Sequence, residues 1–325
     1  MTAVRPCRMV LTGPEDSTTT AVSAAELAAI AAAGEGSTVS VGVAPAVADA
    51  FLAHVVGFDA RPRPGLAVRP GTTTAVDVGP DGRGVIRSLN GDLAPAKLAD
   101  EPVPAGRCRV VVARHGQAMA VEDGEPVWSH HPIGLTAAGR RQAERLAAAL
   151  APLALDAVYT SDLNRAIETA GPVAALSGLR PVVGPELREI FLGELEGQTL
   201  ARVHADHPPF VPWLEVTFNH RFPTGEFHHP ADLVFPGGES VQAVWDRVRA
   251  PFLALVRRHL GATFAVIAHG WVLQPLLCHV IGVPIGHYFR LELPYAAPTV
   301  IEIDADGRGA LVMLNGVDPE EPMIR

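Results

Sequence analysis

Four segments of the sequence carry side chains that could handle a phosphate group. Arg114, His115 and Gly116 follow directly on an apolar run, Arg165 and Glu189 lie further along, and His269 ends a second apolar run. Guanidinium groups bind phosphate oxygens in pairs, and a neutral imidazole is a competent nucleophile toward phosphorus. A carboxylic acid can protonate the leaving oxygen, and a second histidine can stabilise the phosphoryl charge. Taken singly, each residue also fits a structural role, so the combination carries the hypothesis.

The basic residues narrow the ways in which an anion can be bound. Lys97 is the single lysine among the 26 lysine and arginine residues, and it lies in a proline- and alanine-rich stretch. A nucleotide-binding P-loop and a Schiff-base enzyme each need a suitably placed lysine, so both are excluded. We therefore expect arginine, histidine and backbone amides to hold the anion.

The net charge and the hydropathy of the sequence argue against nucleic-acid and membrane partners. The formal net charge is −9 and no lysine- or arginine-rich block occurs, which argues against a nucleic-acid partner. No leader-like segment and no apolar run of about 18 residues is present, so we expect no membrane span and a cytoplasmic protein. Cys7, Cys108 and Cys278 form no CxxC pair, and we expect reduced thiols.

The elements that must position these residues alternate between strand and helix. Apolar runs at 108–113, 156–161 and 263–270 predict buried strands, and amphipathic residues 136–150 predict a helix. Residues 298–315 predict a hairpin that turns at Asp306 and Gly307. This pattern predicts a mostly parallel sheet with helices on both faces and a site beyond the carboxyl ends of its strands.

The N-terminal part contains an internal repeat. A shift of 225 positions aligns residues 38–91 with 263–316 without a gap, and a shift of 101 places residues 7–11 over 108–112. Chance similarity between alanine- and valine-rich segments is the alternative, but the retained strand and turn residues favour duplication. We expect an N-terminal α/β unit at 1–91, a linker at 92–106 and a catalytic domain at 107–325.

The chemically active residues are absent from the N-terminal copy. Gly13 and Pro14 stand where the other copy has Arg114 and His115, and Ala44 stands where it has His269. The segment that holds Arg165 and Glu189 has no counterpart. We therefore expect a shortened, degenerate unit with a structural or pairing role.

Residues 107–325 resemble the histidine phosphatase superfamily, in its phosphoglycerate-mutase-like branch. The matching segments occur in the order of the family: VVVARHGQA, PIGLTAAGRRQAERL, VYTSDLNRAIETA, LREIFLGELEG, FPGGES and VIAHG. The resemblance implies a three-layer α/β/α fold with a mostly parallel mixed sheet. It also implies that the chemistry needs neither a metal nor an organic cofactor.

The resemblance assigns a role to each candidate residue. His115 is the phosphorylated nucleophile, Glu189 is the proton donor, and Arg114, Arg165 and His269 form the phosphate pocket. We add Gly116, Gln117 and Gly270 as substrate-binding residues.

Several positions depart from the family pattern. Ala118 and Val121 replace a threonine and an asparagine that many members carry beside the phosphate. Ile190 and Leu192 replace an arginine and a tyrosine of glycolytic mutases, which favours a phosphatase over a mutase.

The segment 194–237 is long for a connection and rich in histidine and aromatic residues. We interpret residues 205–232 as a lid over the pocket, and a metal site at His204 and His207 is the weaker alternative. Cys108 and Arg114 have the spacing of a cysteine phosphatase, but a strand between them would hold them roughly 20 Å apart.

The sequence thus predicts a phosphatase for a small phosphomonoester, working through a phosphohistidine at His115. The alternatives are a phosphoglycerate-mutase-like phosphotransferase, a non-hydrolytic sensor of a phosphorylated ligand, and a biosynthetic protein recruited from the same fold. The identity of the substrate stays open. A homo-oligomer is compatible with the sequence, because the N-terminal copy could either fill a dimer surface or create one.

Overall fold

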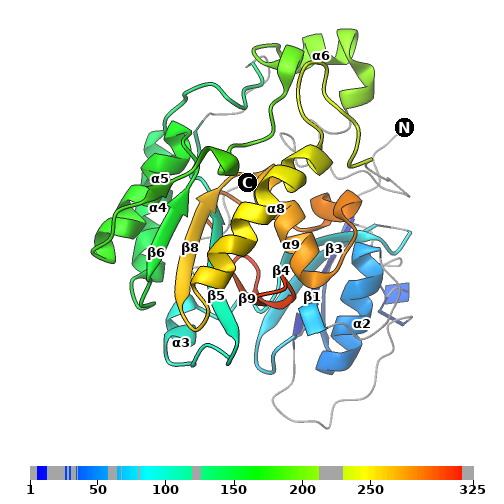
Figure 1. Cartoon of the computed structure of the whole chain (residues 1–325). Coiled ribbons are helices and arrows are strands. Elements are labelled where there is room, and N and C mark those ends of the chain that lie inside the picture. Colours follow the sequence, from blue (N-terminus) through cyan, green and yellow to red (C-terminus); the bar gives the residue numbers. More distant parts are fainter. Residues whose placement is uncertain are drawn as a thin grey trace.

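A computed structural model shows two β-sheets that belong to different parts of the chain (Figure 1). It describes residues 6–12, 26–27, 29–30, 34, 36–57, 64–66, 68–79, 81–118, 126–211 and 230–316. We call residues 6–91 the N-terminal unit and residues 107–316 the catalytic unit, in each case within these ranges.

The catalytic unit is built on a six-stranded sheet with the order β10-β9-β5-β8-β6-β7. Its strands are β5 (Arg107–Arg114), β6 (Ala157–Thr160), β7 (Val182–Val183), β8 (Thr263–Ala268), β9 (Thr299–Asp304) and β10 (Gly309–Met313). β5, β8, β6 and β7 are parallel, whereas β9 and β10 are antiparallel to their neighbours. The mostly parallel mixed sheet expected from the sequence is therefore confirmed, together with the predicted strands and hairpin.

Helices cover both faces of this sheet. The helices are α4 (Ala137–Leu150) and α5 (Asn164–Leu176) on one face, and α8 (Val241–Arg258) and α9 (Gly270–Ile281) on the other. The side chains of β5 alternate between the two layers, as a pleated strand requires. Val110 and Val112 join the core that contains α8 and α9, while Val111 and Ala113 join the core that contains α4 and α5. The three-layer α/β/α arrangement is thus also confirmed.

The N-terminal unit has a smaller sheet of its own, in the order β2-β1-β3-β4. Its elements are β1 (Cys7–Thr12), β2 (Thr38–Gly42), α2 (Pro45–Val56), the 3₁₀ turn η1 (Pro64–Leu66), β3 (Thr73–Val78) and β4 (Gly84–Ser88). Phe51, Leu52 and Val55 of α2 share one hydrophobic core with α8 and α9. The two sheets therefore pack as parts of one body.

The pairing registers of the two sheets correspond residue by residue. Arg8 of β1 lies opposite Thr38 and Asp77, and Arg109 of β5 lies opposite Thr263 and Glu302. The arginines are 101 positions apart (109 − 8), and their partners are 225 apart (263 − 38 and 302 − 77). These are the shifts that relate the repeated segments in the sequence.

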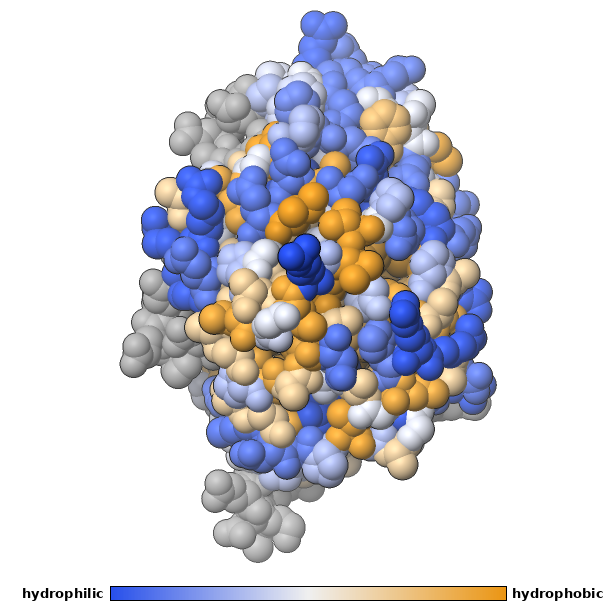
Figure 2. Space-filling model, turned by 60° about the vertical axis from the view of Figure 1, so that its left-hand side comes forward, coloured by the Kyte–Doolittle hydropathy of each residue, from blue (hydrophilic) through white to orange (hydrophobic). Residues whose placement is uncertain are grey.

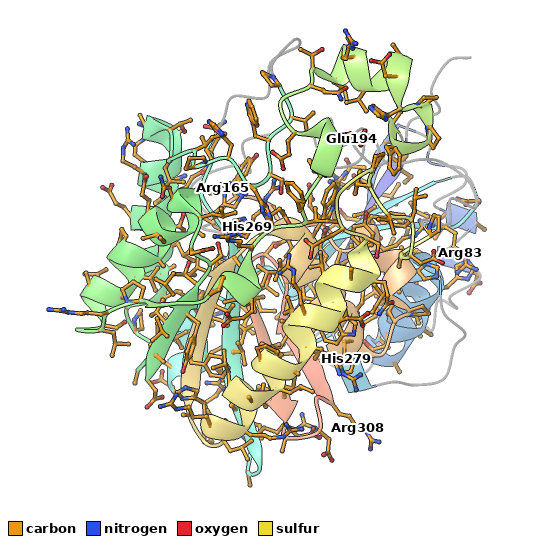
Figure 3. The ribbon with its side chains drawn as sticks, turned by 45° about the horizontal axis from the view of Figure 1, so that its top comes forward. Arg83, Arg165, Glu194, His269, His279 and Arg308 are labelled. Atoms are coloured by element: carbon orange, nitrogen blue, oxygen red, sulfur yellow. The ribbon has the colours of Figure 1, made fainter. Side chains whose placement is uncertain are left out.

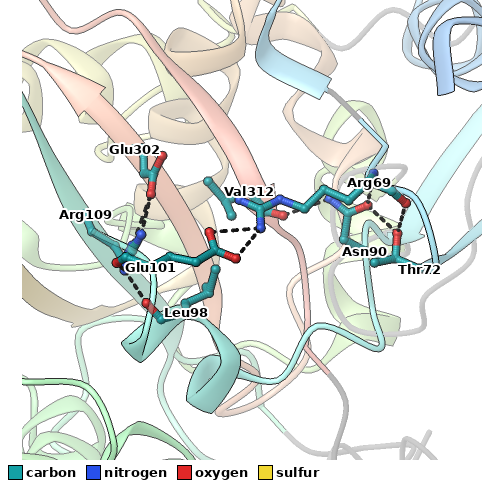
Figure 4. Close-up of polar contacts among 8 residues, drawn as sticks. All are labelled: Arg69, Thr72, Asn90, Leu98, Glu101, Arg109, Glu302 and Val312. Atoms are coloured by element: carbon teal, nitrogen blue, oxygen red, sulfur yellow. Dashed lines mark hydrogen bonds and ion pairs between the residues drawn. The ribbon is translucent and has the colours of Figure 1, made fainter. Parts of the chain in front are cut away.

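Residues 92–106, the expected linker, contain the short helix α3 (Pro95–Ala99), with Leu98 fully buried. Arg109 of β5 donates hydrogen bonds to the carbonyl oxygens of Leu98 (2.6 Å) and Glu101 (3.0 Å). Arg69 of the N-terminal unit forms an ion pair with the Glu101 side chain (Figure 4). The connection is thus fastened to both units, and the division of the chain into domains stays a prediction.

Short helical elements lie in the connections between the main strands and helices. They are η2 (Pro185–Leu187), η3 (Gly193–Leu195), α6 (Leu200–Asp206), η4 (Pro208–Phe210) and η5 (Ile285–Arg290). The expected lid at 205–232 falls largely on residues 212–229, which lie outside the described residues, so it stays a prediction.

One side of the surface carries a hydrophobic area bordered by hydrophilic residues (Figure 2).

At the outer edge of the six-stranded sheet, Val182 and Val183 of β7 are 52% and 47% exposed, and Leu176 of α5 is 61% exposed. Within the described ranges, no helix has the length and apolar character that a membrane crossing requires.

Two glycines let α4 approach the turn that follows β5. A Cβ atom on Gly139 would lie 2.0 Å from the carbonyl oxygen of Gln117, and one on Gly116 would lie 2.5 Å from the carbonyl oxygen of Gly139. Backbone atoms cannot yield cheaply, so both positions need glycine.

We therefore expect Gly139→Ala to lower the free energy of unfolding by about 1–3 kcal/mol. Gly171→Ala in α5 is the matched control, because a Cβ atom there meets nothing within 4 Å. It should change stability by less than about 1 kcal/mol, since better helix propensity is offset by the following proline. Urea unfolding of both variants measures this, and equal stabilities would contradict the account of the close approach.

Candidate active site

The candidate residues meet at the carboxyl end of the central strands. Arg114 ends β5 and His115 follows it, while His269 follows β8. Arg165 lies in the first turn of α5, which begins shortly after β6. Figure 3 shows Arg165 and His269 at the same end of the sheet. Parallel strands bring their carboxyl ends to one edge, which is why segments far apart in the sequence converge here.

The hydrogen bonds of His115 define its tautomer. Nδ1 lies 2.7 Å from the carbonyl oxygen of Gly116, which can only accept, so Nδ1 carries the proton. Nε2 accepts a hydrogen bond from Nε of Arg165 at 3.1 Å. His115 is 6% exposed and therefore held in this orientation. Nε2 is therefore unprotonated, and its lone pair accepts the hydrogen bond from Arg165.

Burial and neighbouring cations keep this imidazole neutral. Burial lowers the pKa of His115 well below its ordinary value, and the positive charges of Arg165 and Arg114 lower it further. The same causes lower the pKa of His269. A protonated imidazole has no lone pair at Nε2, so the electrostatics of the pocket preserve the Nε2 lone pair of His115.

His269 lies beside His115. The two imidazole ring centroids are 5.1 Å apart, and Nε2 of His269 lies 2.6 Å from Oγ of Ser161. Nδ1 of His269 is buried and has no hydrogen-bond partner among the described residues. A buried nitrogen without a partner costs about 1–3 kcal/mol, which a bound anion could recover if this nitrogen carries the proton.

Two guanidinium groups complete the electropositive pocket. Nη2 of Arg165 donates to the carbonyl oxygen of Ser129 at 2.7 Å. The guanidinium carbon of Arg114 lies 4.3 Å from the centroid of the Tyr295 ring, and Nε of Arg114 is buried without a partner in the described part of the chain. One buried arginine that bonds the His115 imidazole and a second, half-buried arginine whose charge acts on it favour a ligand with about two negative charges.

Glu189 places a carboxyl group within the electric field of both arginines. Burial raises its pKa, although hydrogen bonds from the backbone N–H groups of Ile190 and Trp271 and the charges of both arginines oppose the rise. Nε2 of His130 donates to the backbone carbonyl oxygen of Glu189 at 2.7 Å. A carboxyl group with a raised pKa is suited to donate a proton to a leaving oxygen.

The three further residues expected to bind substrate differ in their placement. A Cβ atom on Gly270 would lie 4.0 Å from Nε of Arg114, so this residue does border the pocket. The amide of Gly116 donates to Oγ1 of Thr169, and that of Gln117 donates to Oε1 of Gln142. Contact of Gly116 and Gln117 with the substrate therefore stays a prediction, and the packing against α4 is an additional reason for Gly116.

Several residues of the site were not found by sequence reasoning. Ser161, Ser129, His130, Thr169 and Tyr295 each bond or stack with a candidate residue. Ser129 also donates to the carbonyl oxygen of Ile190, which fastens the segment that carries Glu189. Of these, Ser161 had a signal in the sequence, because it is the last residue of the strand predicted at 156–161.

No group of three or more histidine, cysteine, aspartate or glutamate side chains is placed to bind a metal ion in the ranges that the structure describes. His204 and His207 were suggested as metal ligands. Nε2 of His207 lies 3.4 Å from Nε2 of Gln198. Cys108 and Arg114 both belong to β5, so they lie at opposite ends of one strand.

Known proteins share this architecture. Phosphoserine phosphatase 1 of Hydrogenobacter thermophilus is 25% identical over 211 residues, which are 64% of this chain and 92% of the relative. The adenosylcobalamin/alpha-ribazole phosphatase of Escherichia coli is 29% identical over 200 residues, covering 60% and 90% of the two chains. A mycobacterial glucosyl-3-phosphoglycerate phosphatase superposes with a TM-score of 0.56 at 26% identity, over 65% of this chain and all of that one.

The family model of the histidine phosphatase superfamily (branch 1) matches residues 110–316, which contain every candidate catalytic residue. Together with the fold and the relatives, this match shows that the chain belongs to the histidine phosphatase superfamily.

Proposed function

We propose that the chain hydrolyses a small-molecule phosphomonoester through a phosphohistidine at His115. One observation carries the proposal: Nε2 of His115 is an unprotonated, buried nucleophile that already contacts the guanidinium group of Arg165. The presence of Arg114, His269 and a protonatable Glu189 in the same pocket supports it. The phosphatases among the relatives support hydrolysis as the reaction class.

The first half of the proposed reaction transfers the phosphoryl group to the protein. Nε2 of His115 attacks phosphorus, the bond from phosphorus to the ester oxygen breaks, and Glu189 gives its proton to that oxygen. A phosphoryl oxygen replaces Nε2 as the acceptor for Arg165, which frees the lone pair. Arg114 and His269 stabilise the charge on the remaining oxygens.

The second half returns the protein to its starting state. Glu189, now a carboxylate, takes a proton from water while the water oxygen attacks phosphorus. The bond from Nε2 to phosphorus breaks, and orthophosphate leaves. The carbonyl oxygen of Gly116 holds Nδ1 throughout, so the imidazole keeps its orientation in both halves.

The burial of two apolar side chains close to Glu189 in the sequence supports a phosphatase rather than a mutase. Ile190 and Leu192 occupy the positions where glycolytic mutases carry an arginine and a tyrosine by the resemblance above. Both side chains are at most 1% exposed and belong to the core. They cannot offer charge or a hydroxyl group to a second phosphorylated ligand. Water is therefore the proposed acceptor.

A panel of phosphomonoesters tests this function. We expect orthophosphate release, without added metal, from at least one member of a set that spans phosphoserine, sugar phosphates, nucleotides, phosphoglycerates and an aryl phosphate. His115→Asn should lower the rate by at least about 10³-fold, because no nucleophile remains. Release that survives in His115→Asn, or no release from a folded parent, would reject the proposal.

The pKa shifts predict a rate that falls on both sides of an optimum. His115 must be neutral, so kcat/KM falls as pH drops through its lowered pKa. Glu189 must be protonated, so kcat/KM falls as pH rises through its raised pKa. The two shifts widen the range in which both required forms coexist. We expect Glu189→Gln to remove the alkaline fall and to lower kcat on alkyl phosphates about 10²–10⁴-fold.

The exposed Glu194 provides the control for this profile. Glu194→Gln should keep the parent profile, because its carboxyl group is solvated. With p-nitrophenyl phosphate, whose leaving group needs no proton, Glu189→Gln should lose much less activity in the transfer step. An alkaline fall that persists in Glu189→Gln would assign that ionisation to another group.

A further inference from the structure

We propose that the N-terminal unit is a built-in partner copy that clamps residues 290–296 and thereby holds Tyr295 against Arg114. We call residues 290–296 the strap, because they run from the N-terminal unit to the phosphate pocket. The inference deepens the proposed function, since it assigns a positioning residue and a structural purpose to the part of the chain that lacks catalytic residues.

The contact between the two units is reciprocal. The N–H of Leu89 donates to the carbonyl oxygen of Leu314 at 3.2 Å, and the N–H of Leu314 donates to that of Leu89 at 3.0 Å. Nδ2 of Asn90 donates to the carbonyl oxygen of Val312 at 2.9 Å (Figure 4). Nδ2 of Asn315 donates to the carbonyl oxygen of Arg87 at 2.8 Å. Each pair is exchanged by the shift of 225 positions (314 − 89, 315 − 90 and 312 − 87).

Such an exchange is the mark of a two-fold axis between two copies. In a symmetric dimer, residue i of one subunit contacts residue j of the other, and j contacts i in return. Here both copies lie in one chain, so the axis is local. The catalytic unit therefore uses this face to bind a relative of itself, which the same chain supplies.

Details inside each copy support common descent. Asn90 and Asn315 both adopt positive φ angles, of 51° and 52°. The backbone N–H of each makes the equivalent hydrogen bond: that of Asn90 donates to Oγ1 of Thr74, and that of Asn315 donates to Oγ1 of Thr299. A non-glycine residue rarely adopts this conformation, so its recurrence at equivalent positions favours duplication over chance.

The ion pairs of the two sheets agree with this view. Arg8 binds Asp77 at 2.7 Å, and Arg109 binds Glu302 at 2.7 Å, in the same strand register. The β3–β4 and β9–β10 hairpins also have an irregular register at equivalent points, after Ala75 and before Met313. The N-terminal unit has therefore kept the framework of the duplicated fold while its sequence lost the catalytic residues.

The strap begins against β4 of the N-terminal unit. Ile86 and Leu291 form a parallel bridge, and the N–H of Glu292 donates to the carbonyl oxygen of Ile86 at 3.1 Å. Nη1 of Arg87 forms an ion pair with Glu292 at 2.6 Å, and both side chains are almost buried. A partly buried pair of this kind fixes the strap more firmly than a solvated surface pair would.

The strap ends at the phosphate pocket. The N–H of Ala296 donates to the carbonyl oxygen of Arg114 at 2.9 Å, and Tyr295 forms a bridge with Arg114. The Tyr295 ring lies 4.3 Å below the guanidinium carbon of Arg114 and 5.7 Å from the His115 ring. Tyr295 lies three positions after Glu292, a reach of only about 10 Å.

Stacking of the Tyr295 ring on Arg114 has a physical reason. Arg114 lies in the electric field of Arg165, so the two cations repel each other. The face of an aromatic ring carries partial negative charge and attracts a guanidinium group stacked on it. Tyr295 thus keeps Arg114 in the plane from which it can bind phosphate, and the N-terminal unit keeps Tyr295 in place.

Breaking the clamp outside the pocket tests this inference in the full chain. We expect Arg87→Ala to weaken the binding of inorganic phosphate about 10-fold, measured by calorimetry, and to raise KM for an aryl phosphate more than it changes kcat. Arg87→Lys should recover most of the affinity, because it restores the ion pair with Glu292. An unchanged affinity in Arg87→Ala would overturn the inference.

Arg8→Ala is the matched control: Arg8 and Arg87 both bind Asp77, and Arg87 forms an ion pair with Glu292 of the strap, whereas Arg8 acts on Glu292 through its electric field. Arg8→Ala should shift the unfolding midpoint about as much as Arg87→Ala does, but it should leave the phosphate affinity unchanged. An equal loss of affinity in Arg8→Ala would show a general effect of stability and overturn the clamp. At the pocket itself, Tyr295→Leu should weaken phosphate binding about 10-fold, and Tyr295→Phe should recover it.

The two proposals fail in different ways. A parent chain that binds phosphate but hydrolyses no ester would reject the proposed function, while the calorimetric comparison of Arg87→Ala and Arg8→Ala still decides on the clamp. A parent chain that does not bind phosphate would overturn both.

Discussion

The hydrogen bond from Nε of Arg165 to Nε2 of His115 is the contact on which the site depends. It places a permanent cation against a neutral imidazole inside the protein, where charge is costly. Arg114 and Arg165 repel each other in this pocket, and the phosphate ester of the proposed function would bring the charge that offsets the repulsion. In the proposed mechanism the cations that lower the pKa of His115 are also those that bind the ester, so binding and nucleophilicity would share one physical origin.

The rest of the structure fixes the parts of this contact from several sides. Gly116 and Gly139 let α4 press on the turn that carries His115, and Ser161 holds His269 from the end of β6. Arg165 is anchored through the backbone of Ser129, and the strap brings Tyr295 under Arg114. Each support comes from a different element, and the N-terminal unit adds one that the sheet of the catalytic unit does not provide.

The sequence predicted what local pattern determines and missed what tertiary contact determines. Strand β5 shows as a continuous apolar run and helix α4 as an amphipathic pattern. His115 and His269 directly follow buried strands, so their meeting at one edge was predictable. His130 and Tyr295 lie in irregular segments whose partners are distant in the chain, and no spacing rule reaches them. The expected linker contains α3 because Leu98 is buried and Arg109 bonds its carbonyl oxygen, a contact that composition does not reveal.

The most direct test of the central claim is capture of the phosphorylated intermediate. The parent chain, mixed with its preferred ester and quenched in alkali within milliseconds, should gain the mass of one phosphoryl group on the peptide that contains His115. The bond should be stable in alkali and labile in acid, as a phosphorus–nitrogen bond is, and it should be absent in His115→Asn. Turnover by the parent chain with no phosphoryl group on His115, under conditions that slow the second half-reaction, would contradict the account.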